Sequence, residues 1–189
     1  MLISLRGTNG SGKTTVIRAL LKAAKTQRNI YKVLGNRLPE AYELVIPKVK
    51  KPVYILGPYH LTDCGGCDRL IPFDIIPPLI ASYEKQGHVV FEGVIVSSVY
   101  GQIGALMEKY KKKSVMLFLD TPLKECIRRV QDRRDGREDD RVFDPKNLTM
   151  KFNATIRVKE RALVDGIIRV ETASSVTAHN KIVEILREG

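Results

Sequence analysis

The stretch that decides the fold is Gly7-Thr8-Asn9-Gly10-Ser11-Gly12-Lys13-Thr14-Thr15. It matches the phosphate-binding loop pattern G-x-x-x-x-G-K-[ST], and it lies between an apolar run at 1–5 and an amphipathic helical pattern from residue 14. Glycines let the backbone wrap a phosphate chain with its N–H groups pointing inward, and the following helix adds a favourable dipole. We therefore expect residues 7–15 to bind a nucleoside triphosphate, with Lys13 at the β- and γ-phosphates and the Thr14 hydroxyl on Mg²⁺.

The overall composition is that of a globular protein. The length of 189 residues suits one domain, so we expect residues 1–189 to form a single unit. No apolar run approaches the roughly 20 residues of a membrane span, and we expect no signal peptide before the first strand and no membrane partner. Three cysteines fit a reducing compartment better than a disulfide framework, which indicates a cytoplasmic protein.

The charge is unevenly distributed along the chain. Residues 1–60 hold eleven Lys and Arg against two acids, a net charge of +9, whereas residues 61–189 contribute only +2. Such asymmetry indicates a polyanionic partner beyond the nucleotide, and the basic N-terminal third would bind DNA or another nucleic acid. A solvated basic face that serves solubility is the alternative.

Short apolar runs alternate with helical patterns, which predicts an α/β fold with a parallel sheet. The expected strands are 2–5, 53–56, 88–91, 115–119 and 167–170, and the expected helices are 14–26, 73–86, 99–112, 122–134, 147–163 and 175–187. Residues 30–52 interrupt the alternation with two strand-like runs, 30–34 and 41–46, and a lysine-rich turn. We expect them to form a basic β-excursion, an insertion beside the second core strand.

Three acids are candidates for the chemistry. Glu92 ends an apolar strand, where a carboxylate can order Mg²⁺ or take a proton, although it could also cap the next turn. Asp63 and Asp68 lie in the loop 57–72, which should face the site because ligands bind beyond the carboxyl ends of parallel strands. Either aspartate could accept the proton of an attacking hydroxyl, or could simply be a turn residue.

An arginine-rich run follows the fourth expected strand. Its guanidinium groups could close over the triphosphate as a lid, at about residues 133–145, and stabilise charge on the transferring phosphoryl group. The candidates are Arg133, Arg134 and Arg137. Because acids alternate with these arginines, a salt-bridged helix surface is the alternative.

Two further patterns have weaker functional interpretations. Cys64-Gly-Gly-Cys67 has the spacing of zinc and redox sites, but the sequence contains no second C-x-x-C pair. The two glycines could instead let the backbone approach a substrate closely. Tyr59 and Tyr100 could supply a stacking wall for a base near the loop 57–72.

The loop, the acid-ended strand and the arginine run together resemble the small P-loop kinases of the nucleotide and nucleoside kinase group. The segment from Phe118 to Arg134 is similar to their strand-four, helix and lid segment. The resemblance covers nearly the whole chain and implies an ATP- and Mg²⁺-dependent kinase. It also implies a five-stranded parallel sheet of order 2-3-1-4-5 with helices on both faces. Glu92-Gly93 departs from the Asp-Arg pair of thymidylate kinases, and the Glu-Arg-Ser motif of deoxynucleoside kinases is missing.

Three short motifs narrow the resemblance further: 56–59, 63–68 and 91–93. Their combination resembles bacteriophage kinases that phosphorylate 5-hydroxymethyluracil bases within DNA. That resemblance implies a hydroxyl acceptor, a DNA partner and action in the host cytoplasm, and it would explain the basic N-terminal third. A deoxynucleoside monophosphate kinase and a nucleic-acid-stimulated ATPase or binding module remain alternatives.

Overall fold

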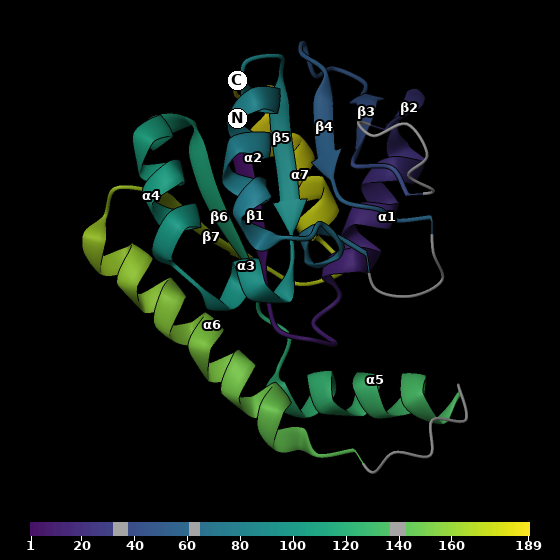
Figure 1. Ribbon diagram of the computed structural model, residues 1–189, viewed down its shortest axis with the longest axis vertical. Helices are drawn as coiled ribbons and strands as arrows, with labels where there is room; N and C mark the ends of the chain where they lie inside the picture. The colour runs from purple at the N-terminus through teal and green to yellow at the C-terminus, as the bar shows by residue number, and fades with distance from the viewer. Residues whose placement is uncertain (32–37, 61–64, 137–142) are drawn as a thin grey trace.

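The computed structural model describes residues 1–31, 38–60, 65–136 and 143–189. Within these ranges one sheet runs through the molecule with helices on both faces (Figure 1). The strands are β1 (Leu2–Arg6), β2 (Thr26–Ile30), β3 (Ala41–Val45), β4 (Val53–Leu56), β5 (His88–Glu92), β6 (Ser114–Leu119) and β7 (Arg169–Ala173). The helices are α1 (Lys13–Ala23), α2 (Ile76–Glu84), α3 (Val94–Ser98), α4 (Gly101–Tyr110), α5 (Leu123–Asp135), α6 (Pro145–Asp165) and α7 (Ala178–Arg187), with short 3₁₀ turns η1 (Cys67–Arg69), η2 (Phe73–Ile75) and η3 (Lys111–Lys113).

The sheet is mixed and seven-stranded, so the predicted five-stranded parallel sheet is wrong as stated. The strand order is β2-β3-β4-β5-β1-β6-β7. The five strands from β4 to β7 in this order are parallel, and they follow the expected order 2-3-1-4-5. The β-excursion adjoins the second core strand: β3 pairs antiparallel with β4, and β2 pairs antiparallel with β3.

The sequence pattern misplaced β2 for a physical reason. The first helix ends at Ala23 rather than at residue 26, and the next strand begins at Thr26. Four of the five residues of β2 are exposed, as expected of an edge strand without an apolar face, so no alternating pattern marks it. The predicted strand 30–34 lies mostly outside the described residues, and β2 already ends at Ile30.

Two apolar layers hold the helices on the sheet. On one face, α1 and α7 bury aliphatic side chains against β1 and its neighbours. On the other face, α2, α3, α4 and α6 pack against the opposite sides of the same strands. The predicted helix 99–112 corresponds to α4, which begins at Gly101 and ends at Tyr110. The short helix α3, which precedes it and ends at Ser98, was not predicted. The expected helices on both faces of an α/β sheet are confirmed.

Because the five strands from β4 to β7 in the sheet order are parallel, all their carboxyl ends lie at one end of the sheet and all their amino ends at the other. Their carboxyl ends lie together at the lower end of the sheet in Figure 1, where α1, α3 and α5 begin. Both chain termini lie at the other edge. The described part of the proposed lid comprises the end of α5 and the start of α6, which Asp144 caps by accepting a hydrogen bond from the Lys146 amide at 2.8 Å. None of the helices described is long and apolar enough to span a bilayer.

Candidate active site

The loop of residues 7–15 leaves β1 and enters α1, as its sequence predicts. Gly10 and Gly12 have φ of 76° and 101°, the left-handed region that glycine adopts without strain. A Cβ atom at Gly10 would lie 2.4 Å from the carbonyl oxygen of Cys126, so the first turn of α5 packs directly on the loop. The loop therefore has the backbone geometry of a phosphate site at a helix N-terminus.

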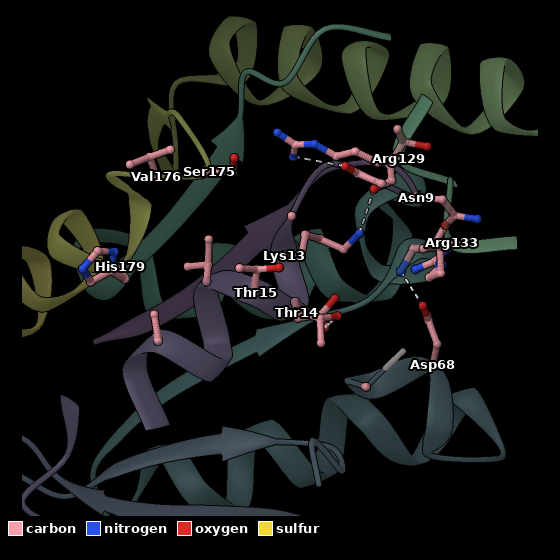
Figure 2. A pocket seen from close by; sticks show the side chains of 18 residues that line it. Asn9, Lys13, Thr14, Thr15, Asp68, Arg129, Arg133, Ser175, Val176 and His179 are labelled. Atoms are coloured by element: carbon pink, nitrogen blue, oxygen red, sulfur yellow. Dashed lines mark hydrogen bonds between the residues drawn. The ribbon is translucent and has the colours of Figure 1, made fainter. Parts of the chain in front are cut away.

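Lys13 lies in the first turn of α1 and is buried. Its ammonium donates hydrogen bonds to the carbonyl oxygens of Gly7 and Thr8, at 2.8 and 3.1 Å. These bonds hold the positive charge at the centre of the loop, where a bound phosphate would meet it. Lys13, Thr14 and Asp68 line one cavity, which has a volume of about 530 Å³. Figure 2 shows how these side chains lie around it.

Glu92 lies beside this loop because β5 is the parallel neighbour of β1, with Glu92 in register with Leu5. The Thr14 hydroxyl donates a hydrogen bond to Glu92 Oε1 at 3.2 Å, and Glu92 is only 2% exposed. Burial raises the pKa of the Glu92 carboxyl to about 7, while the Lys13 charge opposes this rise and Asp68 adds to it. The Thr14 and Glu92 oxygens converge as two ligands of a hard cation would.

Asp68 lines the same cavity, but backbone amides occupy its carboxylate. Oδ2 accepts a hydrogen bond from the Val94 amide at 2.6 Å, and Oδ1 accepts one from the Ile95 amide at 3.1 Å. Asp68 therefore caps the N-terminus of α3 from η1. This contact agrees with the alternative that Asp68 is a structural turn residue. Asp63 lies outside the described residues.

The arginines of α5 divide between two sides of the helix. Arg133 lines the cavity together with the loop, and Figure 2 shows it beside Asn9. Arg134 instead lies with its guanidinium 5.6 Å from the centre of the Phe143 ring and faces the start of α6. Arg137 lies outside the described residues. Of the two predicted lid arginines that the structure describes, Arg133 is therefore the one that lines the cavity at the loop of residues 7–15.

The sequence is similar to known proteins over most of its length. A sequence model described as 5-hmdU DNA kinase matches residues 1–181. The chain belongs to the 5-hmdU DNA kinase family. It is 30% identical over 176 residues to the 5-hmdU DNA kinase of Pseudomonas phage M6, covering 87% of this chain and 86% of that protein. It is 33% identical over 172 residues to the enzyme of Pseudomonas phage PaMx11, covering 90% and 89%.

A solved structure supports the fold of this kinase family member. Deoxyadenosine kinase from M. mycoides superposes with a TM-score of 0.52 at 13% identity, and the match covers 100% of both chains. At this identity the likeness concerns the fold alone. The family model and the phage relatives confirm the expected resemblance to kinases and the expected phosphotransferase activity.

The two candidate stacking tyrosines are buried in this kinase. Tyr59 is 4% exposed, and its ring packs 6.1 Å from that of Tyr42. Burial raises the pKa of Tyr59 well above its usual value, and the neighbouring Glu92 charge adds to the rise. The Tyr100 ring lies under the guanidinium of Arg161, at 4.3 Å. Neither ring offers an open face to a base.

The cysteine motif does not assemble a metal site among the residues described. Cys67 is fully buried, and burial raises the pKa of its thiol well above the usual value, which disfavours a metal-binding thiolate. Cys64 lies outside the described residues. Among the described histidines, cysteines and acids, no three lie close enough together to hold a metal ion.

The cavity residues that sequence reasoning missed include Arg129, Ser175, Val176 and His179. Arg129 donates a hydrogen bond to the Gly10 carbonyl at 3.4 Å and another to Glu125 at 2.7 Å. The i,i+4 spacing of Arg129 and Arg133 places both on one helix face and could have identified Arg129. The other three follow β7, and the rule that ligands bind beyond the carboxyl ends of strands could have found them.

Proposed function

We propose that this chain transfers the γ-phosphate of ATP to the 5-hydroxymethyl group of 5-hydroxymethyluracil in DNA. The observation that carries the proposal is a phosphate-binding loop with a buried acid beside it, in a chain that belongs to the 5-hmdU DNA kinase family. The bond from the γ-phosphorus to the β–γ bridging oxygen breaks. A new bond forms to the hydroxymethyl oxygen, which loses its proton, and ADP leaves.

The donor side of the reaction is assigned to the loop and α5. Backbone amides of residues 7–15 would surround the phosphates, and Lys13 would move from the Gly7 and Thr8 carbonyls to the β- and γ-phosphate oxygens. Arg129 and Arg133 line the cavity from α5 and would hold phosphate oxygens with guanidinium hydrogen bonds. Arg137 would complete the lid, and Arg134 would support the lid through Phe143 and α6.

Glu92 is the acid that we assign to the acceptor hydroxyl. With a pKa of about 7 it is ionised in a large share of molecules near neutral pH, and the ionised form can take the hydroxyl proton. The Thr14 hydroxyl and Glu92 fit Mg²⁺ by their spacing and ligand type, and Mg²⁺ would supply positive charge to the phosphates. Asp68 and Asp63 stay candidates for the same proton transfer, and Asp68 also positions α3.

The acceptor must reach a carboxylate that is almost fully buried. A base that remains stacked in a duplex cannot bring its 5-substituent that deep, so we propose that the base leaves the stack. The basic N-terminal third would contribute to holding the backbone of longer DNA outside the cavity. We propose the host cytoplasm as the place of reaction, because phage DNA is modified there.

Transfer of labelled phosphate tests the proposal. With γ-labelled ATP, label should appear on DNA that contains 5-hydroxymethyluracil and be absent from ordinary DNA of the same sequence. Label on free deoxynucleoside monophosphates instead would show a nucleotide kinase. DNA-stimulated release of inorganic phosphate without labelled DNA would show an ATPase, and either result would overturn the proposed acceptor.

A further inference from the structure

Seven exposed lysines lie along the edge of the sheet opposite the loop of residues 7–15. They occupy the turns that precede three parallel strands, and we call them the lysine edge: Lys48, Lys50, Lys51, Lys85, Lys111, Lys112 and Lys113. The turn before β4 holds the first three, the turn before β5 holds Lys85, and η3 before β6 holds the last three. Because β4, β5, β1 and β6 are successive neighbours, the turns lie in line.

Contacts confirm that these distant segments meet. A surface hollow near both termini is lined by Lys51 from the first turn, Lys85 from the second and Lys113 from the third. The Met1 amine lies between them and contacts His88. Burial, together with the charges of Lys51 and Lys113, lowers the pKa of that amine to about 6. Lys51 and Lys113 are more than sixty residues apart in the sequence, yet both lie close to the Met1 amine.

The lysine edge differs from the arginine-rich surface of α5 in how its charges are paired. On α5, Arg128 and Arg129 form close ion pairs with Glu125, and Arg128 also pairs with Asp132. Within the described part of the chain, Lys113 is the one lysine of this edge that forms an ion pair, with Glu84 at 3.9 Å. Charges that serve solubility alone can be dispersed and paired, whereas this stripe is concentrated and largely uncompensated.

The dimensions match a nucleic-acid backbone. Three strand spacings of about 4.8 Å separate β4 from β6, so the stripe is about 15 Å long. A length of about 15 Å faces roughly four phosphates of one DNA strand. Strands of four to six residues separate the lysine edge from the nucleotide cavity by about 13–20 Å.

We propose that the lysine edge is a second DNA-binding surface, which holds the phosphate backbone of a DNA segment outside the active site. The partner is a long duplex, without preference for base sequence, since lysines in turns contact phosphates rather than base edges. The surface would keep the protein on DNA between successive transfers. The identification of DNA as the polyanion rests on the proposed function, whereas the binding surface itself can be tested without catalysis.

The test uses the full chain and a labelled ordinary duplex of about 30 base pairs, followed by fluorescence anisotropy across salt concentrations. In the variant Lys50→Gln, Lys51→Gln and Lys112→Gln, affinity near 0.1 M salt should fall at least about tenfold, and the salt slope should fall by about two to three units. The matched variant with arginine at the same three positions should bind as the wild type does. Equal affinity and slope in the glutamine variant and the wild type would overturn the proposal.

A second arm separates this surface from the active site. Transfer to a short 5-hydroxymethyluracil strand of about five nucleotides should have the same kcat/KM in the glutamine variant and the wild type, because such a strand bound in the cavity makes few contacts elsewhere. An equal loss of short-strand turnover and duplex affinity would show that the lysines serve the active site and would overturn the proposal. Binding of the wild type to anionic vesicles but not to duplex DNA would do so as well. If no DNA accepts phosphate, the proposed function fails while the anisotropy result still decides this proposal.

Discussion

The Lys13 ammonium stabilises the loop of residues 7–15 and also lies where the triphosphate would bind. Without a nucleotide, its buried ammonium is held by two loop carbonyls, and the same atom lies where the triphosphate would bind. Removing the charge should therefore affect catalysis far more than stability.

We expect Lys13→Ala to lower phosphoryl transfer by orders of magnitude, because the charge that bridges the β- and γ-phosphates is lost. Thermal unfolding should shift only modestly, and Lys22→Ala, an exposed change on the same helix, should transfer at the wild-type rate. The measurement is labelled-phosphate transfer together with a thermal melt. Near-normal turnover by a folded Lys13→Ala protein would refute the ATP site.

Glu92 makes stability depend on pH with a definite sign. Its pKa is about 7 in the folded protein, against the ordinary 4.5, so the folded state binds more protons between these values. Stability therefore falls as pH rises from about 5 to about 7, by up to about 3 kcal/mol for this one group. The Glu92→Gln variant should not show this fall in stability with pH. Urea unfolding of both proteins at pH 5 and pH 8 measures it, and parallel curves would contradict the predicted burial effect.

The same substitution should slow catalysis. Glu92→Gln cannot take a proton and is a weaker ligand for Mg²⁺, so transfer should fall and its rise between pH 6 and about 8 should disappear. Excess Mg²⁺ distinguishes the two roles: recovery of the rate shows a metal-ordering carboxylate, and no recovery shows a base. Normal turnover at ordinary Mg²⁺ would remove Glu92 from the site.

At the scale of elements, α3 depends on a side chain from another segment. Asp68 in η1 accepts hydrogen bonds from the Val94 and Ile95 amides, and α3 in turn packs on α6 and β1. The Gly7 amide donates to the Ser97 hydroxyl at 3.1 Å, so α3 also supports the phosphate loop. Loss of the cap should loosen one wall of the cavity.

We expect Asp68→Asn to retain much of the transfer activity and Asp68→Ala to lose more, because the asparagine oxygen can still accept one of the two amides. The alanine variant should also be less stable by about 1 kcal/mol, as for other lost caps. Steady-state kinetics and thermal melts of both variants check this. If Asp68 is the base instead, both variants should be equally inactive while ATP binding persists.

At the scale of the molecule, residues from the N-terminal and C-terminal parts of the sequence line one cavity. The loop near the N-terminus lies opposite Ser175, Val176 and His179, because β1 and β7 both end at the same edge. Val176 is 77% exposed at the cavity rim. The chain contains no tryptophan, so a single introduced indole would report on this junction alone.

Tryptophan at Val176 should change its fluorescence when ATP binds, since the nucleotide would cover that side of the cavity. Tryptophan at Val164, which is 85% exposed at the end of α6 and does not line the cavity, should respond little. Titration of both variants with ATP provides the comparison. A response only at position 164 would show that the nucleotide lies elsewhere.

The sequence alone determined what depends on neighbouring residues along the chain. The glycines, Lys13 and Thr14 form one contiguous loop between a strand and a helix, so their geometry follows from local conformational preferences. Glu92 was identifiable because an acid that ends an apolar strand must lie at the ligand-binding edge. The five parallel strands could be located from their apolar runs, and their order in the structure is the one that the resemblance to P-loop kinases implies.

The tertiary structure decided what depends on segments that are far apart in the chain. Only the packing of α3 shows that Asp68 caps a helix, and only the register of α5 directs Arg129 and Arg133 to the cavity and Arg134 away from it. The polar edge strand β2 has no periodic pattern because neither of its faces is buried. The lysine edge exists because three separate turns are aligned by strand pairing. Its charge could be counted from the sequence, but its position opposite the active site comes from the sheet order.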